Sequence, residues 1–330
     1  MNTLWPLYHR EIPGFLQRAC VTPPMVRLRD VGMNCGCEYT QFPLFAEIGP
    51  YSRFDHSLGA ALIVWHFTGE EKQALAVLFH DIATPVFAHV VDFLDGDHLT
   101  QSSTERGTAE IVAGSAEIRA LLGELGLAAE DVSDYHRYPI ADNDSPALSA
   151  DRLEYTLGNL VNYGFGDLDT VQTFYEDLTV GNNESGTPEL VFRTPSIAAA
   201  FTKAALRCAR VYVADEDRFA METLAQLLRA ALDRGVLIRD DLRKTEPFVI
   251  AKLRADAVCA PLWERFCAYA HVLRAETKPD SGFWVRVNAK KRWIDPLAAE
   301  RGRVSQWDAE AQTQITDFLT LDFSHWLSGA

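Results

Sequence analysis

The residues best suited to chemistry are two histidines and two aspartates: His56, the adjacent pair His80 and Asp81, and Asp151. Imidazole nitrogen and carboxylate oxygen are good ligands for a divalent ion such as Mn, Fe, Co, Ni, Zn or Mg, and they leave room for water. A His-Asp dipeptide by itself is unspecific, because a chain of this composition contains about one by chance. The segments around these residues must therefore decide the interpretation.

Short helices must position these side chains. Apolar residues recur at helical spacing from residue 54 to about residue 94, with tight corners between the helical stretches. Pro85 suits the first turn of a helix, since its missing N–H would be unpaired there in any case, so we predict a helix that begins at Pro85. We also predict helices over 104–113 and from the N-cap Ser149 through residue 160.

The second half of the chain begins after a stretch rich in turn residues, 180–195, which we interpret as a domain boundary. Residues 196–233 and 246–276 have the periodicity of long helices. Residues 282–296 alternate apolar and polar types and predict a small β-hairpin. We expect an all-α protein with a multi-helix core over 1–180 and a helical C-terminal lobe with a small terminal β element over 181–330.

Composition and charge exclude several classes of protein. The 330 residues are 48% hydrophobic and 23% charged, as in ordinary globular proteins. A net charge of −15 repels nucleic acid, so an anionic substrate must meet a local basic pocket. Apolar runs are shorter than the roughly 18 residues of a membrane span, so we expect no membrane partner. Six scattered cysteines favour a reduced, cytoplasmic protein, and the number of subunits in any homo-oligomer stays open.

Three segments supply the context for the metal candidates: SRFDHSLGAAL (52–62), LAVLFHDIATPVFAHVVDF (75–93) and LSADRLEYTLGNL (148–160). In order, spacing and flanking residues they resemble the HD-domain metal-dependent phosphohydrolases, and most closely the deoxynucleoside triphosphate triphosphohydrolase branch. The resemblance covers about residues 20–165. It implies a helical HD fold, one divalent ion, and hydrolysis of a nucleotide, with a deoxynucleoside triphosphate as the leading substrate.

The resemblance also assigns site residues. It gives four metal ligands, namely His56, His80, Asp81 and Asp151. Arg53 matches a phosphate-binding arginine, a role that suits the forked donors of a guanidinium group. His89 and Asp92 match a histidine-carboxylate pair beside the scissile phosphate, which makes them, with Arg53, the catalytic candidates.

Substrate contacts follow from the same resemblance. Arg152 and Tyr155 match positions that contact phosphate and sugar, and Asn159 stands where a sugar-reading carboxylate is common. An amide there can still accept from or donate to a hydroxyl group. The cluster Lys290–Arg292 would add a basic patch if the terminal hairpin folded over the site.

Two positions depart from the family pattern, because Thr84 and Thr104 stand where histidines are usual. This argues against a second metal ion and leaves other functions open: a nucleoside monophosphatase, a cyclic-nucleotide phosphodiesterase, or a catalytically weak nucleotide-binding regulatory protein. His98 is an alternative proton carrier. The thiols of Cys35 and Cys37 lack a second nearby pair, so local packing is their favoured role.

Overall fold

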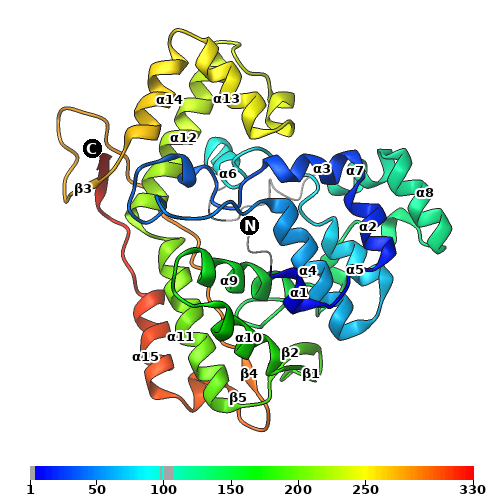
Figure 1. The fold of residues 1–330 in the computed structure, drawn as a ribbon. Coiled ribbons are helices and arrows are strands. Elements are labelled where there is room, and N and C mark those ends of the chain that lie inside the picture. The colour runs from blue at the N-terminus through cyan, green and yellow to red at the C-terminus, as the bar shows by residue number, and fades with distance from the viewer. Residues whose placement is uncertain (1–3, 97–98, 100–106) are drawn as a thin grey trace.

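The structure is a computed structural model that describes residues 4–96, 99 and 107–330 of the chain (Figure 1). It is mostly helical. The helices are α1 (Trp5–Tyr8), α2 (Gly14–Cys20), α3 (Pro23–Arg27), α4 (Arg53–Thr68), α5 (Glu71–Leu78), α6 (Val90–Asp95), α7 (Thr108–Gly114), α8 (Ala116–Leu125), α9 (Ala150–Asn162), α10 (Leu168–Glu176), α11 (Pro195–Val211), α12 (Asp215–Asp233), α13 (Glu246–Ala255), α14 (Cys259–Ala268) and α15 (Ala309–Leu319).

Two small sheets accompany the helices, so the all-α expectation holds only in part. One sheet has the order β1–β2–β4–β5, and the other pairs β3 with β6. β1 and β2 are antiparallel with Leu178 opposite Phe192, and β2 runs parallel to β4. The strands are β1 (Leu178–Asn182), β2 (Pro188–Phe192), β3 (Val272–Ala275), β4 (Leu297–Ala298), β5 (Gly302–Arg303) and β6 (Trp326–Gly329).

The terminal hairpin predicted over 282–296 is wrong. Among the described residues this segment forms no strand, and an isolated β-bridge joins Val285 to Leu327. Its alternation arises because Val285 and Val287 are buried while Arg286 and Asn288 are exposed. The turn-rich stretch 180–195 instead contains the real hairpin, β1–β2.

Several helix boundaries also differ from the sequence prediction. α6 begins at Val90 rather than Pro85, because Phe87 (φ 57°) and Ala88 (φ 45°) adopt left-handed backbone that cannot continue a right-handed helix. The long helix expected over 196–233 breaks between α11 and α12, and the one over 246–276 breaks between α13 and α14. The helix predicted over 104–113 corresponds to α7, which begins at Thr108. Residues 104–106 of the prediction lie outside the described part of the chain.

Helix α4 lies at the centre of the first of the two main hydrophobic clusters. It packs against α5 and α9, and the same cluster continues to Phe192, Phe201 and Ile294, beyond the boundary predicted near residue 180. The second cluster joins α6 to α12, α13 and α14. The division of the chain into two domains at residue 180 therefore stays a prediction.

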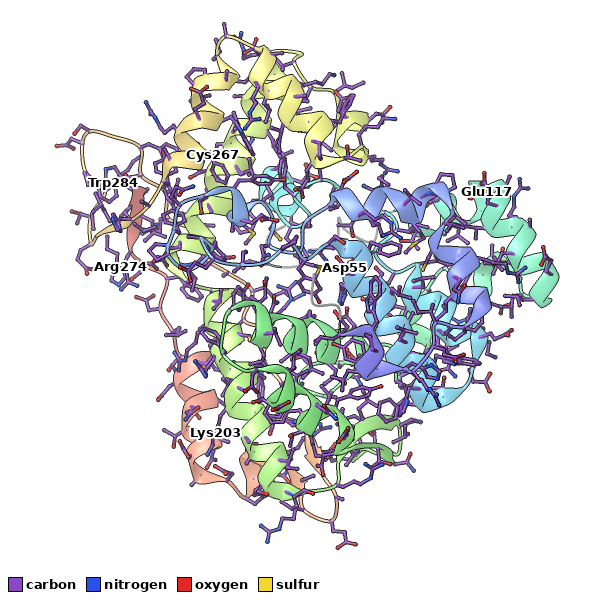
Figure 2. All side chains as sticks on the ribbon, viewed as in Figure 1. Asp55, Glu117, Lys203, Cys267, Arg274 and Trp284 are labelled. Carbon is purple, nitrogen blue, oxygen red and sulfur yellow. The ribbon has the colours of Figure 1, made fainter. Side chains whose placement is uncertain are left out.

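The ends of α4 and α9 are determined locally. Ser52 caps α4 through a capping box with Asp55. Ser149 caps α9, as the sequence predicts, by accepting a hydrogen bond from the Arg152 amide. Asp55 is buried in the interior, whereas the exposed Glu117 and Arg274 lie at the periphery (Figure 2).

Among the described residues, none of the helices has the length and apolar character needed to span a bilayer.

Candidate metal centre and adjoining cavity

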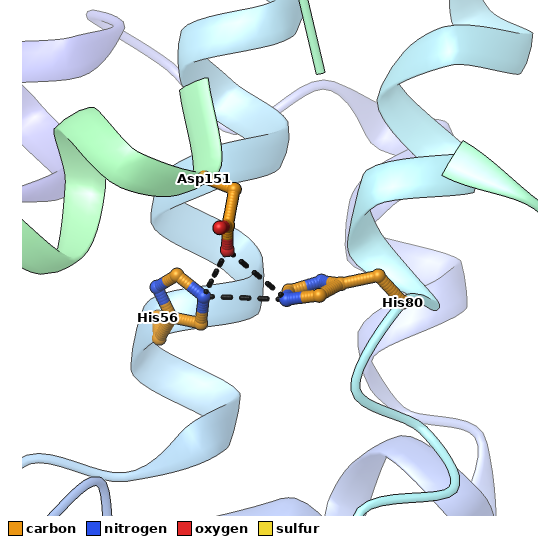
Figure 3. Close-up of side chains that lie close together, drawn as sticks. All are labelled: His56, His80 and Asp151. Carbon is orange, nitrogen blue, oxygen red and sulfur yellow. Dashed lines mark hydrogen bonds and ion pairs between the residues drawn. The ribbon is translucent and has the colours of Figure 1, made fainter. Parts of the chain in front are cut away.

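Three ligand atoms from three separate elements converge at one point (Figure 3). His56 lies in the first turn of α4, His80 follows the end of α5, and Asp151 lies in the first turn of α9. The Nε2 atoms of the two histidines are 3.3 Å apart. Asp151 Oδ1 lies 3.0 Å from His56 Nε2 and 3.4 Å from His80 Nε2. Two imidazoles and a carboxylate at this spacing suit a divalent transition-metal ion.

The far nitrogen of each imidazole is held by the protein. His56 Nδ1 lies 2.6 Å from Glu154 Oε2, and His80 Nδ1 lies 2.6 Å from the Val77 carbonyl oxygen. When Nδ1 donates to these acceptors, the lone pair of Nε2 is directed toward the centre. The arrangement therefore orients both rings as metal ligands.

The electrostatics of the centre favour positive charge. Burial lowers the pKa of His56, but hydrogen bonds with Asp151 and Glu154 outweigh it and raise this pKa to about 10. Burial raises the pKa of Asp151, but hydrogen bonds from His56 and His80 hold it well below its usual range. A cavity wall that stabilises protonated imidazoles also stabilises a bound cation.

Asp81 lies beside this three-residue cluster and is not part of it. Its Oδ2 is 3.5 Å from His80 Nε2 and 3.0 Å from Arg53 Nη1, and its Oδ1 accepts a hydrogen bond from Thr84 at 2.7 Å. Thr84 thus orients this carboxylate. The role of Asp81 as a fourth ligand stays a prediction, and an ion there would share Oδ2 with Arg53.

The sequence-predicted pair His89 and Asp92 is formed. His89 Nδ1 lies 2.9 Å from Asp92 Oδ2, and Asp92 is fully buried. Arg292 Nη2 lies 3.4 Å from His89 Nε2. Burial and the cations of Arg292 and Arg53 outweigh the opposing effect of Asp92 and lower the pKa of His89 to about 4. His89 is therefore a neutral imidazole near pH 7.

A cavity of about 450 Å³ opens over the metal centre. Its wall includes all the site residues predicted from the sequence except Asp92, which lies behind His89. This volume is in the range of ordinary small-molecule sites. The cavity therefore joins the candidate ion, the candidate proton carrier and the candidate substrate contacts in one space.

The three substrate candidates on α9 have different surroundings. Arg152 braces the preceding loop, because its Nη1 donates to Asn143 Oδ1 at 2.7 Å and to Ser149 Oγ at 3.0 Å. The ring of Tyr155 lies between those of His56 and Tyr212, with centroids 6.3 Å and 6.1 Å away. Asn159 donates from Nδ2 to the Tyr212 hydroxyl at 2.8 Å. Their contacts with a substrate stay predictions.

The basic segment Lys290–Arg292 lies in the cavity wall, although it is not on a hairpin. Lys291 Nζ donates to the carbonyl oxygens of Leu319 and Leu321 at 2.6 and 2.7 Å, which ties the segment to the end of α15. The tertiary structure thus brings these cationic side chains into the same cavity wall as His89, which lies about 200 residues earlier in the chain.

Sequence reasoning missed Glu154. This buried carboxylate accepts from His56 and from the hydroxyl group of Tyr51. The available signal was its position three residues after Asp151, which places both carboxylates on one face of α9. His98 and Thr104 lie outside the described residues. The six cysteines are free thiols, and Cys35 lines the cavity.

Comparisons with known proteins identify the fold. No family model matches the chain. The crystal structure of a phosphohydrolase from Bacteroides thetaiotaomicron superposes with a TM-score of 0.64 at 15% identity, over 97% of this chain and 96% of that one. The protein therefore has the fold of a phosphohydrolase.

Two curated sequences are also similar. The uncharacterized protein YdhJ of Bacillus subtilis is 28% identical over 246 residues, which cover 74% of this chain and 72% of that protein. A metal-dependent phosphohydrolase of Cordyceps militaris is 26% identical over 117 residues, or 34% of this chain and 32% of that protein. The likeness to this second protein is partial.

Proposed function

We propose that this protein is a metal-dependent phosphohydrolase of the HD superfamily that acts on a nucleotide, with a deoxynucleoside triphosphate as the leading substrate. The observation that carries the proposal is the convergence of His56 Nε2, His80 Nε2 and Asp151 Oδ1 in the wall of the cavity. The fold shared with a phosphohydrolase and the partial likeness to a metal-dependent phosphohydrolase support it.

His56, His80 and Asp151 would hold the ion, with Asp81 as the adjacent fourth ligand. Two nitrogen donors and carboxylate oxygen suit Mn, Fe, Co, Ni or Zn, and Mg less well, because Mg prefers oxygen ligands. A divalent ion at this point supplies Lewis acidity to a phosphate ester or anhydride.

Cationic side chains would bind the phosphate. Arg53 has an Nε with no hydrogen-bond partner among the described residues, and it lines the cavity together with Lys290 and Arg292. In a chain with a net charge of −15, this local positive field is what lets an anion enter. A guanidinium group can also neutralise the charge that develops on the phosphoryl oxygens.

His89 would move the proton. Asp92 accepts from His89 Nδ1, so His89 Nε2 carries the lone pair. The neutral ring can accept a proton from the attacking water, and the proton is then stabilised by Asp92. Phosphate bound nearby would draw Arg292 away from His89 Nε2 and leave this atom available.

Thr84 favours a second candidate within the same class. It replaces a family histidine and donates to Asp81 Oδ1, so one group that would serve a triphosphate is absent at this position. A nucleoside monophosphate or a cyclic nucleotide needs fewer phosphate contacts, and either is the second candidate substrate.

The test uses the purified full chain, stripped with a chelator and reloaded separately with Mn, Co, Ni or Mg. Deoxynucleoside triphosphates, nucleoside monophosphates and cyclic nucleotides are supplied, and the products are separated and identified. We expect metal-dependent formation of triphosphate, of phosphate or, from a cyclic nucleotide, of the ring-opened monophosphate. This activity should be lost in Asp151→Asn and kept in His66→Ala, a change at an exposed histidine on the same helix as His56. Hydrolysis that is equal with and without metal would contradict the proposal. Nucleotide binding without hydrolysis would favour the regulatory function.

A further inference from the structure

One end of the cavity is formed around Asp217, in the first turn of α12. This side chain is only 9% exposed. Its Oδ2 is buried without a hydrogen-bond partner among the described residues, and its Oδ1 lies 3.8 Å from the Cys37 thiol, a weak donor. A buried carboxylate oxygen in a cavity wall with no donor is costly unless a ligand or water supplies one.

Asn159 offers a second acceptor of the same kind. It is 5% exposed, its Nδ2 donates to the Tyr212 hydroxyl, and its Oδ1 is buried with no partner in the part of the chain that the structure describes. Carboxylate and amide oxygens accept hydrogen bonds but cannot donate them. When Asp217 is ionised, the two residues therefore require donors from whatever fills this end.

Tyr212 links the chain segments that carry the two acceptors. Its hydroxyl accepts from Asn159, and it follows the last residue of α11 and lies five residues before Asp217, at the corner between α11 and α12. Burial raises the pKa of the Tyr163 hydroxyl well above its usual value, and the nearby charge of Asp217 raises it further. Tyr163 and Tyr212 both line the cavity, so aromatic rings accompany the acceptors.

The distance from the metal centre is also informative. Asp151 and Asn159 lie on the same helix, eight residues apart, and eight residues of α-helix rise about 12 Å. Tyr155 lies between them, one turn from each. This separation is comparable to the span from the phosphate of a nucleotide to the far edge of its base.

We propose that this end of the cavity binds the nucleobase and that Asp217 and Asn159 accept hydrogen bonds from its exocyclic amino group. This assigns Asn159 to the base rather than to the sugar contact that the family resemblance implies. The inference rests on the proposed nucleotide substrate and narrows it to guanine, adenine or cytosine. A base with a carbonyl oxygen in place of the amino group would direct the lone pairs of that oxygen at the acceptor oxygens of Asp217 and Asn159, which is repulsive. Sites built to pair with a donor reject analogues that lack it, because the protein acceptors are then left unsatisfied.

The test measures binding of nucleosides without phosphate, so it does not depend on hydrolysis. 2′-Deoxyadenosine, 2′-deoxycytidine and 2′-deoxyguanosine are each compared by calorimetry with an analogue that lacks only the amino group. Measurements are made at pH 8.5, because burial raises the pKa of Asp217 to about 8 and the ionised carboxylate is purely an acceptor. We expect at least one amino nucleoside to bind about 10-fold to 100-fold more tightly than its partner.

Two variants assign the selectivity to Asp217. Asp217→Asn keeps the size of the side chain but adds a donor, so the affinity ratio should fall toward one. Glu216→Gln removes the same charge one residue away, outside the cavity wall, and should keep the ratio. Unfolding of both variants is followed by heat, so that a loss of fold is recognised.

The outcomes separate this inference from the proposed function. Equal affinities within every pair, no detectable binding of any nucleoside, or an unchanged ratio in Asp217→Asn would overturn the inference. Amino-selective binding in a protein that hydrolyses no nucleotide would overturn the proposed enzyme function and keep this inference.

Discussion

The two ends of the cavity differ in how their polar atoms are satisfied. At the metal end, Glu154 and Val77 hold the far nitrogens of the histidines, and Arg53 and Thr84 occupy the oxygens of Asp81. At the other end, where we propose that the base binds, the oxygens Asp217 Oδ2 and Asn159 Oδ1 have no partner among the described residues. The fold thus preorganises the metal end by its own hydrogen bonds, whereas the other end is completed by a ligand.

The largest effect that this comparison predicts is at the metal end. His80→Ala removes one of the three converging donors, and the remaining proposed ligands, His56, Asp151 and Asp81, cannot replace it. We expect loss of the bound metal by elemental analysis and a fall in kcat/KM of about three powers of ten or more. Full metal occupancy in this variant would show that the convergence is structural only.

Substitution of His89 separates proton transfer from metal binding. His89→Gln keeps a polar side chain but removes a group that can gain and lose a proton. Turnover should fall by about 10² to 10⁴, the usual range for a lost general acid or base, while the metal content stays that of the parent. Asp92→Asn should lose less, because the imidazole remains. Parent-like turnover in His89→Gln would mean that the proton moves by another route.

Substitution of Arg53 tests whether this residue both stabilises the folded protein and assists hydrolysis. Arg53→Ala should lower kcat/KM by about two powers of ten, or about 2.7 kcal/mol, as when one charge-stabilising donor is removed. Because its partner Asp81 is buried, the metal-free variant should also melt several degrees earlier. Arg53→Lys keeps the charge and should recover most of the stability but little of the activity. Full activity in the lysine variant would contradict a role for the forked guanidinium group.

Glu154 tests the preorganisation of the metal end most directly. Glu154→Gln keeps the size of the side chain but weakens the acceptor that orients His56, and loss of such a partner costs about 10-fold to 100-fold in metal affinity. Competition with a coloured chelator measures the change. Glu176→Gln, at the exposed end of α10, is the matched control. Unchanged affinity would mean that the ring of His56 is oriented by packing alone.

The smallest expected effect concerns the pKa of His89. Burial is the main cause of its value of about 4 and Arg292 contributes to the lowering, so Arg292→Ala should raise the value. Because the pKa is below that of an unfolded histidine, its contribution to the free energy of unfolding is present above about pH 6.5 and is lost as the pH falls toward 4. Side-chain nitrogen NMR measures the pKa in both proteins, and unfolding by denaturant across the same pH range measures the free energy. A titration of His89 near pH 6.5 would show that the ring is solvated.

Local patterns in the sequence predicted α9 well. Apolar spacing and the cap Ser149 involve residues only a few positions apart, and such signals act before the chain packs. Other local patterns misled. The alternation in 282–296 reflects a segment lying over a hydrophobic interior rather than pairing within a hairpin, and nothing in the local sequence distinguishes the two cases.

The sequence by itself determined the kinds of metal ligand, their order and the helices that bear them. Only the tertiary structure decided which partners orient them. Arg53 pairs with Asp81 across 28 residues, His56 meets Glu154 across 98, and Arg292 reaches His89 across 203. Contacts at such separations depend on how the helices pack together, and helix packing depends on the shape of whole faces rather than on any short pattern.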